Sequence, residues 1–222
     1  MSPFLWFLLL ILAALSYFSG GLNGAIIASK LIFKDDIRLH GSKNAGLTNF
    51  MRTYGKKSAL WVILIDTLKT AVPIFICWVA FTHFVPLSPS FNAADRAITG
   101  RVFGAMFAIL GHSYPPLYGF RGGKGVLAGG TAAIFIDWRV AIIVFGIFLL
   151  AVIFTRYVSL GSVLAGLLFP ISFFIFDFHT IGLILSACCG FFIVFRHRGN
   201  ITRLLKGEER KLSLKRKKEG VS

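Results

Sequence analysis

Long apolar stretches, separated by shorter polar segments, run through most of the chain. Crossing a bilayer as a helix takes roughly 20 apolar residues. Seven stretches are candidates for such spans, although the fourth falls short of that length; they are residues 4–28, 58–81, 97–112, 125–137, 140–157, 160–177 and 180–195. The pattern predicts an all-α, polytopic integral membrane protein with about seven transmembrane helices.

The polar segments between these spans differ in charge. Of 24 Lys and Arg residues, 20 lie in residues 30–57, 121–124, at Arg156 and from Arg196 onward, whereas three lie on the other side. Basic loops stay on the cytoplasmic side of a membrane, so the N-terminus is expected outside and the C-terminus in the cytoplasm. Five crossings would give the same sidedness. We expect a single transmembrane catalytic domain, residues 1–205, and a basic cytoplasmic tail, residues 206–222.

Composition narrows the class of protein. The chain is 56% hydrophobic and 15% charged, with a net charge of +15, which excludes disorder, collagen-like repeats and an ordinary soluble enzyme. So much positive charge indicates either nucleic acid or an anionic membrane surface as a partner. Little soluble sequence remains to present a nucleic-acid-binding face, so we expect anionic membrane lipids and no nucleic acid. No obligatory protein partner is inferred.

The first polar segment with candidate chemistry is residues 40–49, followed by Arg52. Its glycines allow backbone N–H groups to converge on an anion, and the Arg52 guanidinium suits phosphate. Neutral donors are supplied by Ser42, Asn44, Thr48 and Asn49. The same composition is also typical of a flexible linker with helix-capping residues, and both interpretations stay open for this segment alone.

The second segment is Gly111–Pro116 followed by Phe120–Gly125. Its glycines and one lysine precede a predicted helix, and helix N-termini favour anions; these residues are Gly122, Gly123, Lys124 and Gly125. The pattern is not a Walker A loop, so phosphate binding is favoured over ATP hydrolysis. The alternative is a cytoplasmic turn with two basic anchors.

The third segment has two parts, Ser159–Ser162 and Arg196–Arg203. His197 and Asn200 are three residues apart and share a helical face. Neighbouring cations oppose protonation of His197, so its ring is expected to stay neutral near pH 7. The alternative for Arg196–Arg203 is charge that only fixes the end of a span at the membrane surface.

Two charged residues, Asp66 and Lys69, lie inside the second predicted span. Charges within a membrane are costly and indicate function, but an i,i+3 ion pair that fixes packing explains them equally. The cysteines Cys77, Cys188 and Cys189 lack metal-site spacing. HxxxxD, HExxH and Gly-x-Ser-x-Gly patterns are missing from the sequence, so we expect neither a covalent nucleophile nor a metal or other cofactor.

Together these segments resemble a known family. GSxNxGxTNxxRxxGKK, GHxxPxxxxFRGGKGV, SLGS and RHxxNIxRLLxGxE, in this order, are similar to the bacterial acyl-phosphate:glycerol-3-phosphate acyltransferases over nearly the whole chain. The resemblance implies seven membrane helices and transfer of a fatty acyl group from acyl phosphate to glycerol 3-phosphate. Lysophosphatidic acid and inorganic phosphate are then the products of this first acylation step of phospholipid synthesis. Family members need no metal or nucleotide and act at the cytoplasmic face of the bacterial inner membrane.

The resemblance also implies roles for particular residues. Ser42 and Arg52 would hold phosphate, with Asn44 beside them, and Lys124 would contact phosphate oxygens. Gly122, Gly123 and Gly125 would surround the acyl phosphate, Ser162 matches the second serine of SLGS, and His197 and Asn200 would bind glycerol 3-phosphate. Lys43 departs from the family pattern, which has glycine at this position.

Two other classes of protein remain as alternatives. A transporter for phosphorylated solutes would also use helix ends and cations, but no inverted repeat is visible and the polar segments share one side. A structural membrane protein leaves the Gly-Gly-Lys-Gly turn unexplained. For acyl transfer, the proton acceptor is either His197 or the substrate's own phosphate, which the cationic surroundings favour.

Overall fold

The computed structural model describes residues 3–85, 87–88 and 90–212. Within these ranges the chain forms ten α-helices and two short 3₁₀ turns; the helices are α1 Pro3–Gly20, α2 Gly24–Phe33, α3 Leu47–Tyr54, α4 Lys56–His83, α5 Ala93–Ser113, α6 Val126–Ile136, α7 Trp138–Thr155, α8 Val158–Ile175, α9 Thr180–Arg196 and α10 Arg198–Leu205. The predicted all-α class is confirmed. The lysine-rich end, residues 215–218, lies outside the described residues.

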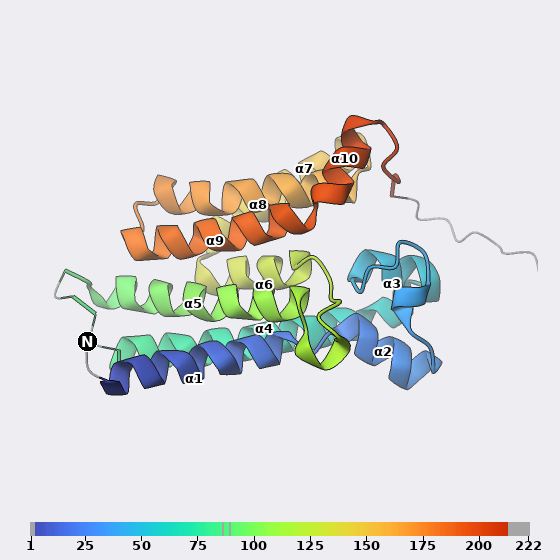
Figure 1. Ribbon diagram of the computed structural model, residues 1–222. Helices are drawn as coiled ribbons and strands as arrows, with labels where there is room; N and C mark the ends of the chain where they lie inside the picture. Colours follow the sequence, from blue (N-terminus) through green and yellow to red (C-terminus); the bar gives the residue numbers. More distant parts are fainter. Residues whose placement is uncertain (1–2, 86, 89, 213–222) are drawn as a thin grey trace, which may run out of the picture.

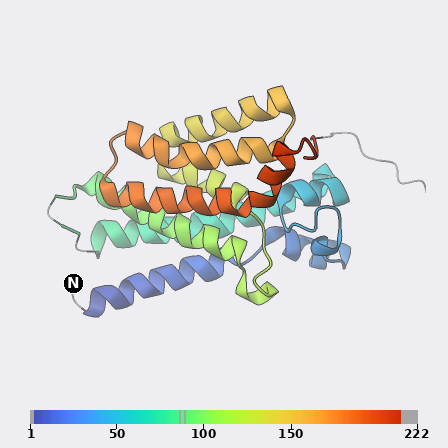
Figure 2. The same cartoon turned by 45° about the horizontal axis from the view of Figure 1, so that its top comes forward.

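The long helices lie side by side as a bundle (Figure 1). α5 lies at its centre and packs against α1, α4, α6 and α9, while α7, α8 and α9 pack in sequence on one side. The short helices α2, α3 and α10 gather at the end opposite the N-terminus, and a second view shows the same arrangement (Figure 2). Both glycine-containing loops, residues 34–46 and 114–125, also lie at that end.

The first predicted span, residues 4–28, is not one helix. The structure divides it into α1 and α2, because the Asn23 side chain accepts a hydrogen bond from the Ile26 N–H (3.0 Å) and starts a new helix. Gly20 and Gly21 precede this break, and Gly20 packs directly on the backbone of α5 at Ala108. The other six predicted spans correspond to α4 through α9.

Length and composition qualify four helices as membrane spans, namely α1, α4, α7 and α8. α9 qualifies only when it is counted together with α10, from which it is separated by a bend of 57°. α6 has 11 residues, and α5 carries Arg96 and Arg101. The count of seven crossings and their orientation therefore stay predictions.

Candidate active site

A cavity of about 1040 Å³ opens at the end of the bundle where the polar segments meet. The loop before α3, the loop before α6, the start of α8 and the α9–α10 junction all contribute to its walls. Eight of the ten site residues predicted from the sequence line it: Ser42, Asn44, Arg52, Gly122, Lys124, Ser162, His197 and Asn200. The structure thus brings the separate motifs together, while their roles remain predictions.

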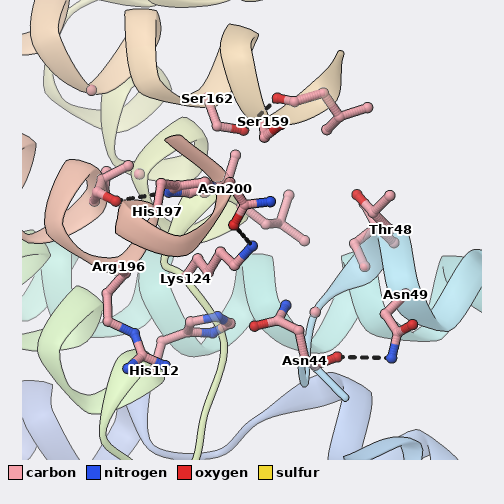
Figure 3. Close-up of a pocket in the computed structure, with 18 of the residues that line it drawn as sticks. Asn44, Thr48, Asn49, His112, Lys124, Ser159, Ser162, Arg196, His197 and Asn200 are labelled. Carbon is pink, nitrogen blue, oxygen red and sulfur yellow. Dashed lines mark hydrogen bonds between the residues drawn. The ribbon is translucent and has the colours of Figure 1, made fainter. Parts of the chain in front are cut away.

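Lys124 lies at the centre of the polar wall (Figure 3). Its Nζ donates a hydrogen bond to Asn200 Oδ1, and Asn200 Nδ2 donates to Glu209 Oε1 at 3.0 Å. Burial lowers the pKa of Lys124 to about 8, although the Glu209 carboxylate opposes this shift. Nearby guanidinium groups lower the pKa further. The lysine is therefore still mostly charged at pH 7.

His197 lies at the bend between α9 and α10 and is 2% exposed. Its Nδ1 is 2.7 Å from the Ile193 carbonyl oxygen, which can only accept, so Nδ1 carries a proton and Nε2 of the neutral ring is an acceptor. Burial lowers the pKa of His197 to about 4, and the Lys124 charge contributes in the same direction. The expectation of a neutral ring near pH 7 agrees with this shift.

Asn49 organises the first loop. Its Nδ2 donates to the carbonyl oxygens of His40 (3.0 Å) and Asn44 (3.1 Å), and its Oδ1 accepts from the Ser42 N–H (3.0 Å). The Asn49 amide was predicted as a donor for substrate, but the loop itself uses it. Ser42 and Asn44 instead remain at the cavity wall.

The backbone conformation at Lys43 is one that favours glycine. Its φ is +57°, in the left-handed region, where a side chain costs about 1–2 kcal/mol. Lysine at this position therefore strains the loop, and it removes no polar group from the cavity wall.

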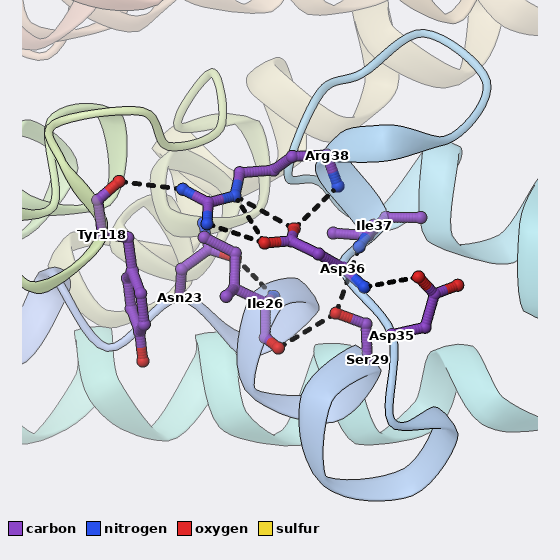
Figure 4. A network of polar contacts seen from close by, with 8 residues as sticks. All are labelled: Asn23, Ile26, Ser29, Asp35, Asp36, Ile37, Arg38 and Tyr118. Atoms are coloured by element: carbon purple, nitrogen blue, oxygen red, sulfur yellow. Dashed lines mark hydrogen bonds and ion pairs between the residues drawn. The ribbon is translucent and has the colours of Figure 1, made fainter.

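The first loop is tied to the second at the outer rim of the site (Figure 4). Arg38 forms an ion pair with Asp36 (2.7 Å) and donates from Nη1 to the Tyr118 carbonyl oxygen at 2.8 Å. Asp36 in turn accepts a hydrogen bond from the Arg38 N–H (3.0 Å). This ion pair fixes the direction of the guanidinium and joins the two loops.

The Gly122–Gly123 turn is held from two directions. The Gly123 N–H donates to the His112 carbonyl oxygen (3.1 Å), and Arg196 Nη2 donates to the Gly123 carbonyl oxygen (3.0 Å). The Arg196 guanidinium also stacks over the Tyr114 ring at 4.9 Å. The Gly123 N–H is thus already bonded within the protein, and neither Gly123 nor Gly125 is among the residues that line the cavity. Gly125 has φ +77° and starts α6.

The start of α8 adds two hydroxyl groups to the cavity wall. The Ser162 hydroxyl donates to the Val158 carbonyl oxygen at 2.8 Å. The Ser159 hydroxyl is buried and has no hydrogen-bond partner among the residues the structure describes. An unpartnered buried hydroxyl is costly unless a ligand or water satisfies it, so Ser159 joins the candidate site.

Glu209 is a second residue that the sequence analysis did not select. Its carboxylate bonds both Asn200 Nδ2 and Arg203 Nε (2.9 Å) beside Lys124. It closes the RLLxGxE motif, and this position was the available signal. Gly207, with φ +70°, turns the chain back after α10 so that Glu209 reaches the cavity.

Away from this polar mouth, the cavity wall becomes apolar. Side chains from α6, α7, α8 and α9 form this part, among them Val126, Phe145, Phe148, Phe169 and Ile193. A single cavity therefore offers cations and glycines at one end and hydrocarbon at the other. Among the described residues, no cluster of His, Cys, Asp and Glu side chains could hold a metal ion.

This fold and site define the class: an integral membrane protein of apolar helices with a basic cavity that continues into an apolar cleft. A family model described as glycerol-3-phosphate acyltransferase matches residues 10–207. The chain belongs to the glycerol-3-phosphate acyltransferase family. The family, the fold class and the enzyme class predicted from the sequence are thereby confirmed.

Individual relatives agree with this assignment. A glycerol-3-phosphate acyltransferase of Finegoldia magna is 37% identical over 207 residues, covering 92% of this chain and 96% of the relative. One of Shewanella baltica is 36% identical and covers 98% of each chain. The transporter alternative finds no support among these proteins.

Solved structures show the same fold. PlsY (YgiH), an integral membrane glycerol 3-phosphate acyltransferase, in its glycerol 3-phosphate form matches with a TM-score of 0.79 and 31% identity, covering 92% of this chain and 96% of that chain. Its lysophosphatidic acid form matches with a TM-score of 0.77 and 30% identity, covering 93% and 96%.

Proposed function

We propose that this chain transfers a fatty acyl group from acyl phosphate to glycerol 3-phosphate, releasing lysophosphatidic acid and inorganic phosphate. The observation that carries the proposal is the cavity, in which Lys124 and Arg52 stand at the mouth and an apolar cleft lies behind. A molecule with an anionic phosphate head and a fatty chain fits such a cavity. Glycerol 3-phosphate adds a second anion, and the cations offset the repulsion between the two substrates.

The chemistry requires little covalent work from the protein. A glycerol hydroxyl oxygen attacks the acyl carbonyl carbon, the new C–O bond forms, and the bond between that carbon and the phosphate oxygen breaks. Phosphate leaves readily, so no serine or cysteine nucleophile is needed. The protein holds both substrates in reacting geometry, and Lys124 stabilises charge on the departing phosphate.

The attacking hydroxyl gives its proton to substrate phosphate in this proposal. His197 is a weak base because its pKa is about 4, far below the pH at which a general base works well. Its Nε2 is nevertheless an acceptor and can receive a hydrogen bond from the second, non-reacting hydroxyl of glycerol 3-phosphate. His197 and Asn200 then position glycerol 3-phosphate.

His197→Gln tests this assignment. Because glutamine keeps a polar group near the position of Nε2, we expect KM for glycerol 3-phosphate to rise while kcat changes much less. Steady-state kinetics with glycerol 3-phosphate varied at saturating acyl phosphate measures the split. A loss mainly in kcat would show instead that His197 accepts the proton.

The pH profile tests Lys124 as a charged group. Its pKa of about 8 predicts that kcat/KM, which reports the free enzyme, falls as the pH rises through 8 and the ammonium loses its proton. Initial rates between pH 6.5 and pH 10 should be corrected for spontaneous acyl phosphate hydrolysis. The arginine of Lys124→Arg retains its charge throughout this range. Any residual kcat/KM of this variant should therefore not fall as the pH rises through 8. A profile that stays level to the alkaline end would contradict the assignment.

The identity of the acyl donor has its own experiment. Purified protein in detergent is supplied with acyl phosphate and labelled glycerol 3-phosphate, and labelled lysophosphatidic acid is measured. We expect product without acyl-CoA or acyl carrier protein. Product formed only with one of those thioesters would overturn the proposed donor while leaving the acyltransferase class intact.

We further propose that the cavity faces the cytoplasm at a bacterial inner membrane. Residues that line its mouth come from three segments, 30–57, 121–124 and the chain from Arg196 onward. In the sequence these segments carry most of the basic residues. Positive loops stay on the cytoplasmic side. Labelling of Lys57→Cys by a membrane-impermeant thiol reagent, in a background without native cysteines, should require permeabilised cells.

A further inference from the structure

Three buried polar side chains lie together at the cavity wall, Asp66 and Lys69 on α4 and His112 near the end of α5; Asp66 and His112 line the cavity, whereas Lys69 lies behind them. Their exposed fractions are 1%, 4% and 3%. Lys69 Nζ lies 2.8 Å from Asp66 Oδ1 and 2.9 Å from His112 Nδ1. We call these residues the Asp66–Lys69–His112 triad. From the sequence alone, a functional role and a packing role were equally consistent with Asp66 and Lys69.

The triad fixes how the His112 ring is protonated. A charged lysine has donors and no acceptor, so Lys69 donates and His112 Nδ1 accepts. The neutral imidazole then carries its proton on Nε2. This edge of the ring faces Gly123, where an added Cβ would overlap His112 Nε2. Lys69 on α4 thus fixes the orientation of the His112 ring, and the ring in turn packs against Gly123 in the second loop.

Contacts of the triad lead to both loops that form the polar wall. On one side, Asp66 Oδ1 accepts from the Gly24 N–H (3.0 Å), and the adjacent Asn23 Nδ2 donates to the Ala45 carbonyl oxygen (3.1 Å) in the first loop. On the other side, the His112 carbonyl oxygen accepts from the Gly123 N–H (3.1 Å) in the second loop.

The two loops also touch each other above the triad. A Cβ built on Gly123 would lie 2.7 Å from the Ala45 carbonyl oxygen. Asn44 precedes Ala45 and Lys124 follows Gly123, and both line the cavity. A small movement at this contact therefore changes the separation of Asn44 and Lys124, which belong to the two loops that the resemblance assigns to phosphate binding.

We infer that Asp66, Lys69 and His112 are positioning residues for acyl transfer, which set the separation of the Asn44 loop and the Lys124 loop. The inference rests on the proposed function of this cavity. Stability alone accounts poorly for the triad, because a buried ion pair generally stabilises no more than a well-packed apolar pair. Asp66 and His112 line the cavity, but the Asp66 carboxylate would repel phosphate, and the His112 Nε2 edge faces Gly123. Lys69 is not among the lining residues, so positioning is favoured over direct binding, and the second test below separates the two for His112.

The first test removes both charges together, since a single variant would leave one buried charge unpaired. Asp66→Asn with Lys69→Met keeps an acceptor for the Gly24 N–H but deprives His112 of its donor. We expect little change in unfolding temperature and a fall in kcat on the order of 10²-fold, as for reacting groups misplaced by about 1 Å. Thr70→Val is the matched control, because the Thr70 hydroxyl bonds its own helix at Asp66 O (2.8 Å).

The second test separates positioning from contact with substrate. Asparagine in place of His112 keeps an acceptor near the position of Nδ1, whereas glutamine keeps a donor near the position of Nε2. We expect His112→Asn to retain more of the parent kcat than His112→Gln. The reverse order would show that Nε2 touches substrate and would overturn the inference. A lower unfolding temperature with unchanged kcat and KM per folded enzyme, in either test, would also overturn it.

A third measurement tests the positioning role independently of the identity of the acyl donor. Binding of glycerol 3-phosphate to the parent and to the double variant is measured by calorimetry without any acyl donor. We expect binding to weaken at least severalfold in the double variant, because its phosphate would meet a displaced Lys124. Equal affinities with equal turnover would contradict the positioning role, whereas a parent that transfers acyl groups only from a thioester would contradict the donor alone.

Discussion

We expect replacement of Lys124 with alanine to lower the turnover of acyl transfer by roughly 10²–10³-fold, the usual cost of removing one preorganised charge-stabilising donor from an active site. Lys124 is partly buried and joined to Asn200, beside the Gly122–Gly123 turn and the start of α6. Because the turn is held by His112 and Arg196, the ammonium is in place before substrate arrives. In the proposed reaction, alanine would leave the departing phosphate without that charge.

The measurement is kcat with acyl phosphate and labelled glycerol 3-phosphate at saturation. Lys57→Ala is the matched control, since Lys57 is an exposed cation in the first turn of α4 that does not line the cavity. It should retain the parent rate. Near-normal turnover in Lys124→Ala would exclude this residue from phosphate binding in the reacting complex.

Much of the fold follows from the apolar pattern, because each buried or lipid-facing helix needs a continuous apolar run. Six of the seven predicted spans correspond to α4 through α9 within a few residues. The first did not, since its apolar residues continue through a break that depends on one capping side chain, Asn23. Local capping and the packing of Gly20 on α5 compete with the hydrophobic signal at such a position.

The candidate site divides in a similar way. Residues such as Lys124, His197 and Asn200 could be predicted from the sequence, because charged and polar residues near glycines are conspicuous in a mainly hydrophobic chain. The residues that hold them in place could not be predicted, because these contacts depend on which distant segments of the chain come together in the fold. Asn49 was selected for the wrong reason, as a substrate donor, whereas it holds the first loop. Glu209 reaches Asn200 only through the turn at Gly207.

The contact between the two loops has no signal in the sequence at all. Ala45 and Gly123 belong to different motifs and meet only because α4 and α5 pack side by side. Glycine at position 123 looks like part of a phosphate-binding turn, yet its N–H is bonded to His112. In the fold its missing side chain matters more than its amide.

Gly123→Ala therefore has a large expected effect that the Gly-Gly-Lys-Gly pattern alone would not give. The new Cβ would overlap His112 Nε2 and lie 2.7 Å from the Ala45 carbonyl oxygen. Neither neighbour can move freely, since Lys69 holds the ring and Asn23 holds the carbonyl. The φ of Gly123 is outside the left-handed range, so the cost is contact alone.

We expect the loops to separate by about 1 Å and kcat to fall on the order of 10²-fold, with weaker binding of glycerol 3-phosphate. Gly146→Ala is the control: nothing lies within 4 Å of an added Cβ at this α7 position, and alanine favours a helix over glycine by about 1 kcal/mol. It should keep the parent kcat and unfold at the same or a higher temperature. If Gly123→Ala matched it in both measurements, the loops would not be held at a fixed separation, and the distance between Asn44 and Lys124 would have to be set by the substrates themselves.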